Sequence, residues 1–473
     1  MNYAVIGRIL SWVLRTEGLL MLLPCLIALI YGEWQGLVYL ALGVGAIAAG
    51  WLLSRKKIAN PAIYQREGFV SVGLSWVVLS LYGAIPFVIT GEIPVFLDAL
   101  FEIVSGFTTT GSSILANVEA LSHTSLFWRS FSHWIGGMGV LVFILMMIPS
   151  GSGGTQINLM KAESPGPDVS KFVPRVKNTA IVLYRIYLGM TLLMIAILAF
   201  SGMNWFHNLC ITFGTAGTGG FGVLNSSCAE YTPFQQWIIT IFMIAFGVNF
   251  SFYYLLLTKN FYEAFHLEEV GAYLAITWQI EPRYGNFEEA LRVAYFQVGS
   301  IITTTGFSTV DFDLWPSFSK TILVMLMIIG ACAGSTGGGV KVSRVVLVMK
   351  SIKQELRQII HPHGVQCVRM DKKTVDRKVL SSLYVYLTSY FFVFGLSVLA
   401  ISLENFSFTT NFTAVAATLN NIGPGLAEGG PSRNFGGYGD FSKLVLIFDM
   451  LAGRLELLPM LLLFYPRTWS SKC

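Results

Sequence analysis

Four short segments rich in threonine and glycine recur along the chain, each at the end of a half-apolar stretch between two longer apolar stretches. Threonine and glycine present backbone carbonyls with little bulk, and threonine adds a hydroxyl, so these residues can replace the hydration shell of a monovalent cation. Glycine also reaches positive φ at low cost, which lets a carbonyl turn inward. Aligned on one glycine, the segments are Thr109-Thr110-Gly111, Thr218-Gly219-Gly220, Thr304-Thr305-Gly306 and Asn421-Ile422-Gly423. We predict that they form a filter for a potassium-type ion.

The stretch before each segment is too short to cross a membrane. At about 12 residues and about 1.5 Å per residue it covers roughly half of a bilayer, which predicts a re-entrant helix. The non-helical end of such a helix must be buried in protein or line an aqueous cavity, and its partial negative charge favours a cation. A single Thr-Thr-Thr-Gly is more often a helix end or a packing turn. Four segments in the same context predict a narrow filter on one axis.

The composition of the four segments excludes one kind of pore. None of them contains Asp or Glu, whereas divalent-selective pores use rings of carboxylates. Carboxylates that could concentrate cations at the mouth, or could simply solvate the outer loops, are Glu119, Glu230, Asp311, Asp313 and Glu428. Because the four segments differ in sequence, we expect one well-defined ring at the glycines and modest selectivity against sodium.

A second glycine-rich run lies in the long apolar stretch after the third segment. Its glycines are too dense for a regular helix, and it lacks the spacing of a phosphate-binding loop. We expect a broken transmembrane helix that lines the cavity below the filter and acts as a gate; the alternative is a glycine seam for close helix packing. The expected gating loop contains Gly334, Ser335, Thr336, Gly337, Gly338, Gly339 and Lys341.

Three charged residues, Asp449, Arg454 and Glu456, lie in the last apolar stretch. A cation at mid-membrane is costly and usually functional. Arg454 is therefore a candidate electrostatic brake on cations below the filter. The alternative is a structural ion pair of Arg454 with Glu456 or Asp449.

The composition predicts an integral membrane protein without a sizeable soluble domain. Of 473 residues, 54% are hydrophobic and 12% are charged, and the mean hydropathy is +0.63. Roughly nine or ten spans are expected from stretches close to the length of a spanning helix. These stretches are residues 18–30, 37–53, 69–88, 126–148, 181–200, 237–257, 321–334, 380–400 and 444–464. No nucleophile–base pair or metal-ligand spacing indicates an enzyme, and the six cysteines are expected to be free thiols.

The fold class predicted is an all-α integral membrane protein in which four pseudo-symmetric membrane–pore–membrane repeats surround one central pore, preceded by two extra transmembrane helices. Basic clusters near Arg55, Lys171 and Lys350 place both termini in the cytoplasm, and this charge indicates contact with anionic lipid rather than nucleic acid. The expected parts are residues 1–60 (two N-terminal helices), 61–150 (repeat 1), 151–260 (repeat 2 with a cytoplasmic linker), 261–350 (repeat 3 with the gating loop) and 351–473 (repeat 4 with a cytoplasmic linker).

Together these motifs resemble the TrkH/TrkG/KtrB superfamily of bacterial potassium-uptake proteins over essentially the whole chain. Besides the four segments, the resemblance rests on residues 129–139, 162–167, 174–175, 330–344 and 453–459. The two helices before the first repeat favour the TrkH type over the shorter KtrB type. One departure is that only residues 270–280 are apolar where the first helix of repeat 3 belongs.

The resemblance implies a homodimer in which each subunit has its own pore, in the bacterial cytoplasmic (inner) membrane. It implies a gating loop at residues 334–339 and an arginine, Arg454, below the filter. It further implies a cytosolic regulatory ring of the TrkA type on the basic cytoplasmic face. NAD or ATP would bind that partner, and no nucleotide would bind this chain.

The function expected is gated potassium uptake, with K⁺ as the permeant ion. The alternative is a proton- or sodium-coupled secondary transporter, which would require ionisable groups poised at mid-membrane. The residues around Asp449 and Arg454 are the candidates for that role.

Overall fold

The computed structural model describes residues 1–55, 64–139, 176–257, 268, 287–363, 366–371 and 373–470. Within these ranges the chain is helical apart from an antiparallel ladder of β1 (Arg369–Met370) and β2 (Lys373–Thr374). The α-helices are α1 (Tyr3–Leu20), α2 (Leu22–Tyr31), α3 (Gln35–Leu53), α4 (Gln65–Thr90), α5 (Phe96–Phe107), α6 (His123–Gly137), α9 (Val176–Phe200), α10 (Trp205–Gly217), α11 (Pro233–Gly247), α12 (Phe250–Leu257), α15 (Phe287–Ile302), α16 (Ser317–Ile329), α17 (Val342–Ile360), α18 (Arg377–Ile401), α19 (Phe408–Leu419), α20 (Asp440–Arg454) and α21 (Leu458–Phe464). The 3₁₀ turns are η1 (Val118–Ala120), η2 (Phe312–Leu314), η3 (Ser402–Glu404), η4 (Ala427–Gly429), η5 (Phe435–Gly437) and η6 (Pro466–Thr468).

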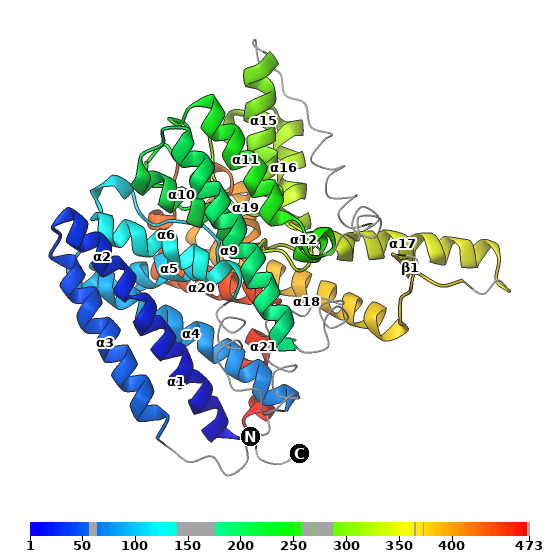
Figure 1. Ribbon diagram of the computed structural model, residues 1–473. Helices are drawn as coiled ribbons and strands as arrows, with labels where there is room; N and C mark the ends of the chain where they lie inside the picture. The colour runs from blue at the N-terminus through cyan, green and yellow to red at the C-terminus, as the bar shows by residue number, and fades with distance from the viewer. Residues whose placement is uncertain are drawn as a thin grey trace.

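The N-terminal helices α1, α2 and α3 lie together at one side of the molecule, and α17 projects from the opposite side (Figure 1). Helices α1 and α3 approach closely because Gly18 and Gly43 face each other. A Cβ on either glycine would lie closer than 3.0 Å to the carbonyl oxygen of the other. The two chain ends lie near each other, where the Tyr3 hydroxyl donates to the carbonyl of Trp469 at 3.4 Å.

Five helical stretches in the described part of the chain are long and apolar enough to cross a membrane. They are Tyr3–Tyr31, Gln35–Leu53, Arg66–Thr90, Ala180–Phe200 and Arg377–Glu404. Large apolar side chains cover their outer faces; Leu29 is 79% exposed and Phe200 is 93% exposed. A surface of this kind is unfavourable in water and suits lipid. The protein is therefore a multi-pass, helical membrane protein.

Three stretches counted as spans from their hydropathy are interrupted, one of them (residues 321–334) as its glycines predicted, so the described residues contain fewer straight spans than the nine or ten expected. The interrupted stretches are residues 237–257, 321–334 and 444–464. Helices α11 and α12 meet at a bend of 93° between Gly247 and Phe250. Helix α16 ends at Ile329, and α20 ends at Arg454 before α21 begins at Leu458. Hydropathy misses these breaks because apolar residues flank them on both sides.

Helices α5, α10, α15 and α19 precede the four Thr/Gly segments and contain 12, 13, 16 and 12 residues. All four are shorter than a typical membrane-spanning helix. Asn204 caps α10 and Ser407 caps α19, each accepting a hydrogen bond from a backbone amide of the first turn. Acidic residues lie in the first turn of the other two helices, Asp98 in α5 and Glu288 with Glu289 in α15, where they stabilise the positive helix end.

Candidate functional site

The four Thr/Gly segments share one backbone conformation. They are numbered here as segment 1 (residues 109–111), segment 2 (218–220), segment 3 (304–306) and segment 4 (421–423). The first residue of each is left-handed, with φ of 57° at Thr109, 54° at Thr218, 55° at Thr304 and 54° at Asn421. The third residue of each is a glycine at positive φ, between 80° and 107°. The segments therefore match in conformation even where their sequences differ.

In each of the four segments, this backbone conformation ends the preceding helix with the same C-terminal cap. In segment 1 the Thr109 amide donates to the carbonyl of Gly106 at 3.1 Å and the Thr110 amide to that of Ser105 at 2.8 Å. The equivalent pairs, at the same 3.1 and 2.8 Å, are Thr218 to Thr215 with Gly219 to Gly214, Thr304 to Ile301 with Thr305 to Ser300, and Asn421 to Thr418 with Ile422 to Ala417. This is the bonding pattern of the Schellman motif, which ends a helix sharply at a left-handed residue.

The structure brings the four glycines together in a closed cycle. A Cβ built on any one of them would lie closer than 3.0 Å to a backbone carbonyl oxygen of another segment. The glycine-to-carbonyl pairs are Gly111 with Gly219, Gly220 with Thr305, Gly306 with Ile422, and Gly423 with Thr110. Each carbonyl belongs to the residue before the next glycine, so the cycle visits segments 1, 2, 3 and 4 in turn and returns to segment 1. Segments 1 and 3 are therefore opposite each other, as are 2 and 4.

Side chains reinforce this ring. The threonines of the segments, Asn421 and Ile422 are fully buried. Asn421 Nδ2 donates to the Thr110 hydroxyl at 2.9 Å, and the Ser112 hydroxyl donates to the carbonyl of Gly423 at 2.8 Å. The junction between segments 4 and 1 is thus held by uncharged groups.

On the outer side, all four segment glycines line one pocket of about 230 Å³. None of the five carboxylates expected at the mouth lines this pocket, and among the described residues its one charged lining residue is Arg433. Two of those carboxylates have partners beside the pocket or further away: Glu119 accepts from the amide of Asn225, a lining residue, at 2.9 Å, and Asp313 lies 3.6 Å from Lys320 Nζ.

The glycine-rich loop between α16 and α17 lies beneath the ring. It packs on the bend between α11 and α12, where the Cys332 amide donates to the carbonyl of Gly247 at 3.2 Å and the Phe250 amide to that of Gly334 at 3.0 Å. Thr336 is fully buried and its hydroxyl donates to the carbonyl of Phe246 at 3.2 Å. The bend between α11 and α12 thus accommodates the loop between α16 and α17.

Within the loop, short-range contacts fix its shape. The Ser335 hydroxyl donates to the carbonyl of Cys332 at 2.7 Å and accepts from the Gly337 amide at 3.3 Å. Gly339 packs directly against Gly330, with no room for a Cβ. Lys341, at φ 86°, donates through Nζ to the carbonyl of Gly337.

Arg454 and the loop together connect two opposite segments. The Arg454 guanidinium donates to the Thr109 hydroxyl at 3.3 Å and to the carbonyl of Thr336 at 2.8 Å. Two residues further along the loop, the Gly338 amide donates to the Thr304 hydroxyl at 2.6 Å. Because Thr109 belongs to segment 1 and Thr304 to segment 3, this chain of contacts crosses beneath the centre of the ring. We refer to it as the cross-bridge.

Arg454 is held on its other side by the end of α6, where it donates to the carbonyls of Gly136 and Gly137, the latter at 2.8 Å. The two acids near it in sequence have other partners among the described residues. Glu456 forms an ion pair with Arg344 of α17, and Asp449 accepts from the Ser397 hydroxyl at 2.7 Å. The alternative of a local Arg454 ion pair thus has no support within the described chain.

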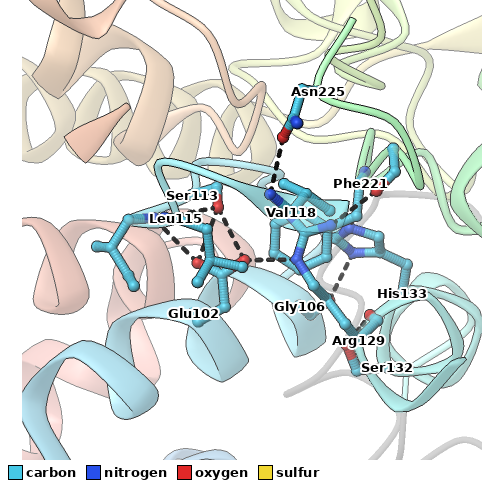
Figure 2. A network of polar contacts seen from close by, with 12 residues as sticks. Glu102, Gly106, Ser113, Leu115, Val118, Arg129, Ser132, His133, Phe221 and Asn225 are labelled. Carbon is cyan, nitrogen blue, oxygen red and sulfur yellow. Dashed lines mark hydrogen bonds and ion pairs between the residues drawn. The ribbon is translucent and has the colours of Figure 1, made fainter. Parts of the chain in front are cut away.

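Sequence reasoning assigned no role to a polar cluster behind segments 1 and 2, formed by Glu102, Arg129 and His133 (Figure 2). All three side chains are buried. The sequence feature that could have indicated this cluster is an acid and a base within apolar stretches, because charged side chains inside a membrane are usually functional. The apolar residues 270–280, where the first helix of repeat 3 is expected to start earlier or to be shortened, and the linker motif at 162–167 lie outside the described residues.

Comparison with known proteins places the whole chain beside one family of transport proteins. A family model described as a cation transport protein, TrkH, matches residues 40–268 and 285–472. The Trk system potassium uptake protein TrkH of Salmonella typhimurium is 35% identical, with 100% of both chains covered, and TrkG of Escherichia coli K12 is 29% identical, with 99% of both covered. The crystal structure of the potassium transporter TrkH from Vibrio parahaemolyticus superposes with a TM-score of 0.87 at 30% identity, covering 99% of this chain and 100% of that one.

Proposed function

Because this chain belongs to the TrkH family of cation transport proteins, we propose that it takes up potassium across the cytoplasmic membrane through a gated, channel-like pore. The family is one of transport proteins rather than enzymes. The observation that carries the proposal is the closed cycle of four glycines and four carbonyls. A ring of backbone oxygens with one helix end behind each member is suited to a partly dehydrated monovalent cation.

The filter comprises segments 1 to 4, and K⁺ is the ion that passes through them. Their carbonyls would coordinate the ion, and the hydroxyls of Thr109, Thr218 and Thr304 form the inner rim. The segment glycines line the outer pocket, which supports an entry path from that side. No nucleotide is assigned to this chain.

The gate is the glycine-rich loop at residues 334–339 together with Arg454, and the described conformation is closed. The cross-bridge supports this assignment because it passes beneath the centre of the ring, where a permeating ion would leave the filter. The guanidinium adds a positive charge on the same path, which opposes a cation electrostatically. Opening would require release of the hydrogen bonds to Thr109 and Thr304.

The architecture we propose is four membrane–pore–membrane repeats around this pore, with two preceding helices and both termini in the cytoplasm. The recurrence of one cap in four places supports the repeat, and the nearness of the two chain ends supports a common side. The boundaries given by the sequence, at residues 60, 150, 260 and 350, remain predictions.

The partners we propose are a second copy of this chain and a cytosolic TrkA-type ring that binds NAD or ATP. Helix α17 supports an assembly role because it projects from the body (Figure 1) and carries exposed apolar side chains at helical spacing. These are Met349, Ile352, Leu356, Ile359 and Ile360. Its basic residues, among them Lys353 and Arg357, suit a cytoplasmic face near anionic lipid.

The test is potassium uptake by cells that lack their own potassium systems. The wild-type chain should restore growth at low potassium, and Gly111→Ser and Gly306→Ser should not, because either side chain would displace a carbonyl of the next segment. Gly437→Ser is the matched control, since a Cβ there meets nothing within 4 Å. If both filter variants carried potassium with unchanged selectivity, the filter assignment would be wrong.

A proton- or sodium-coupled transporter is the competing function. In a lipid bilayer with a fixed potassium gradient, a channel should reverse at the potassium equilibrium potential at every pH. A reversal potential that follows the proton or sodium gradient would favour the coupled mechanism instead.

A further inference from the structure

A buried ion pair lies directly behind segments 1 and 2. Glu102 of α5 and Arg129 of α6 have side chains that are 0% and 3% exposed, and Arg129 Nε donates to Glu102 Oε1 at 2.5 Å. Burying two charges is costly, and their attraction repays the cost only when further hydrogen bonds satisfy both groups. The remaining partners of the pair therefore indicate its role.

Those partners lie just after two neighbouring segments. Both oxygens of Glu102 accept from the Ser113 hydroxyl, at 3.0 and 3.1 Å, and one accepts from the Ile114 amide at 3.0 Å. Arg129 Nη1 donates to the carbonyl of Gly222 at 2.9 Å. Ser113 follows Gly111 by two residues, and Gly222 follows Gly220 by two. The ion pair thus joins equivalent points of segments 1 and 2.

Two aromatic contacts fix the same junction. The Arg129 guanidinium lies 3.5 Å from the centre of the Phe221 ring, which is a cation–π geometry. One turn further along α6, His133 Nδ1 lies 2.7 Å from the Gly106 carbonyl oxygen, and Nε2 accepts from the Phe221 amide at 3.3 Å. Figure 2 shows both side chains of α6 directed at the residues around Phe221. Phe221, the residue directly after segment 2, is therefore held from α6 at its side chain and at its backbone.

The other junctions described are held differently. Segments 4 and 1 meet through uncharged groups, as in the contact between Ser112 and Gly423. Between segments 3 and 4, Asp313 accepts from the Ala427 amide at 3.3 Å and lies near Lys320, but these two charged side chains are 32% and 30% exposed. Salt screens an exposed pair much more than a buried one. Of these three junctions, the one between segments 1 and 2 is thus the one fixed by a desolvated ion pair.

We propose that Glu102 and Arg129 form a clamp that sets the spacing of the carbonyls of segments 1 and 2, and that they are positioning determinants of potassium-over-sodium selectivity. The proposal rests on the potassium pore proposed above. Selectivity depends on the size of the oxygen cage or on the number and field strength of its oxygens, and both depend on how far the cage can relax. A clamp on one junction limits contraction of the ring around the smaller sodium ion.

The experiment measures the potassium-to-sodium permeability ratio from bi-ionic reversal potentials of purified protein in lipid bilayers. Removing one charge alone would leave its partner buried and unpaired, so the test variant is Glu102→Gln with Arg129→Leu, which removes both. We expect this variant to conduct potassium with its permeability ratio reduced about fivefold. A ratio equal to that of the wild type in a conducting variant would overturn the clamp.

Arg129→Lys is a second variant that tests the proposal independently of the double substitution. Lysine retains the charge and the pairing with Glu102, but it lacks the planar fork that also reaches Gly222 and stacks on Phe221. We expect an intermediate ratio, about twofold below the wild type. A variant with normal expression and an unchanged ratio would count against the proposal even if the double variant did not assemble.

The matched control is the ion pair of Lys443 and Asp98, whose Nζ and Oδ1 lie 2.5 Å apart. It joins α20 to the first turn of α5, at the end of that helix away from segment 1. Lys443→Met with Asp98→Asn should leave the permeability ratio unchanged. If the wild-type protein carried no potassium current, the proposed pore would be refuted. An unchanged permeability ratio in a conducting variant would refute only the clamp, so the two failures are distinguishable.

Discussion

The ring of four segments repeats one structural unit, whereas the part of the protein beneath the ring does not. In the ring, one helix cap is made four times with the same pair of hydrogen bonds, and one glycine–carbonyl contact is repeated around a closed cycle. Beneath it, the helices that return from the ring end in different ways: α11 at a sharp bend, α16 at a glycine-rich loop and α20 at an arginine followed by a short helix. Coordination of an ion requires equivalent groups around it, whereas control of a path requires one movable element. In the proposed function, the repeated ring coordinates the ion and the unrepeated layer beneath it controls the path.

The largest effect should follow from breaking the ring. Gly220→Ala places a methyl group closer than 3.0 Å to the carbonyl oxygen of Thr305 and demands positive φ from alanine. We expect potassium flux to fall by at least about tenfold, because a displaced carbonyl costs more than 1.4 kcal/mol in ion binding. Rubidium uptake into proteoliposomes measures this. Gly437→Ala, in open space, should match the wild type, and equal flux in Gly220→Ala would contradict the equivalence of the four segments.

The next effect should come from the layer beneath. Arg454→Gln removes the positive charge and weakens the contacts to Thr109 and Thr336. Basal flux should rise about fivefold to tenfold, since both the electrostatic barrier and the cross-bridge are reduced. The permeability ratio should stay the same because the ring is untouched. A change in selectivity without a change in basal flux would show that the two layers are not separate.

A smaller effect should follow from loosening one end of the cross-bridge. Thr304→Ala removes the hydroxyl that accepts from the Gly338 amide. A hydrogen bond of this kind contributes about 1 kcal/mol, so basal flux should rise roughly fivefold at most. Thr304→Ser restores the hydroxyl and is the control. If serine and alanine gave the same flux, the contact between the loop and segment 3 would have no part in closure.

The smallest effect concerns the outer pocket. Arg433→Gln removes its one charged lining residue, which should raise inward potassium current by up to about twofold in dilute buffer. The difference should disappear near 1 M salt, where the screening length is about 3 Å. A difference that persisted at high salt would mean that Arg433 acts by contact rather than by charge.

The sequence predicted the residues of the ring better than the layer beneath it. Aligning the segments on one glycine is sufficient because the cap and the glycine are local features. Arg454 was a candidate because a charge in an apolar stretch is conspicuous, but the sequence left open whether it faces the pore or forms a structural ion pair. The bend after Gly247 was not predictable, because the residues on both sides of it are apolar and a hydropathy window cannot distinguish a bent helix from a straight one.

The contacts that join different segments were beyond the reach of sequence reasoning for a separate reason. Glu102 and Arg129 come from different helices, and nothing in their spacing specifies that they meet. The cross-bridge likewise unites residues from four separate parts of the chain. A single sequence reports periodicity along one helix, but it contains no direct record of contacts between helices. For the same reason, the sequence did not indicate that Arg433, rather than the expected carboxylates, lines the outer pocket.

The left-handed residue that opens each segment explains why the fourth copy looks so different. A β-branched residue at positive φ is strained, whereas asparagine enters this region readily. Asn421 therefore gives segment 4 the same shape as the others. In segments 1 to 3, threonine adopts that shape at a higher conformational cost. The same backbone conformation is thus reached by different residues in the four segments. A comparison of backbone dihedral angles therefore shows the similarity of segment 4 to the others more clearly than a comparison of residue types does.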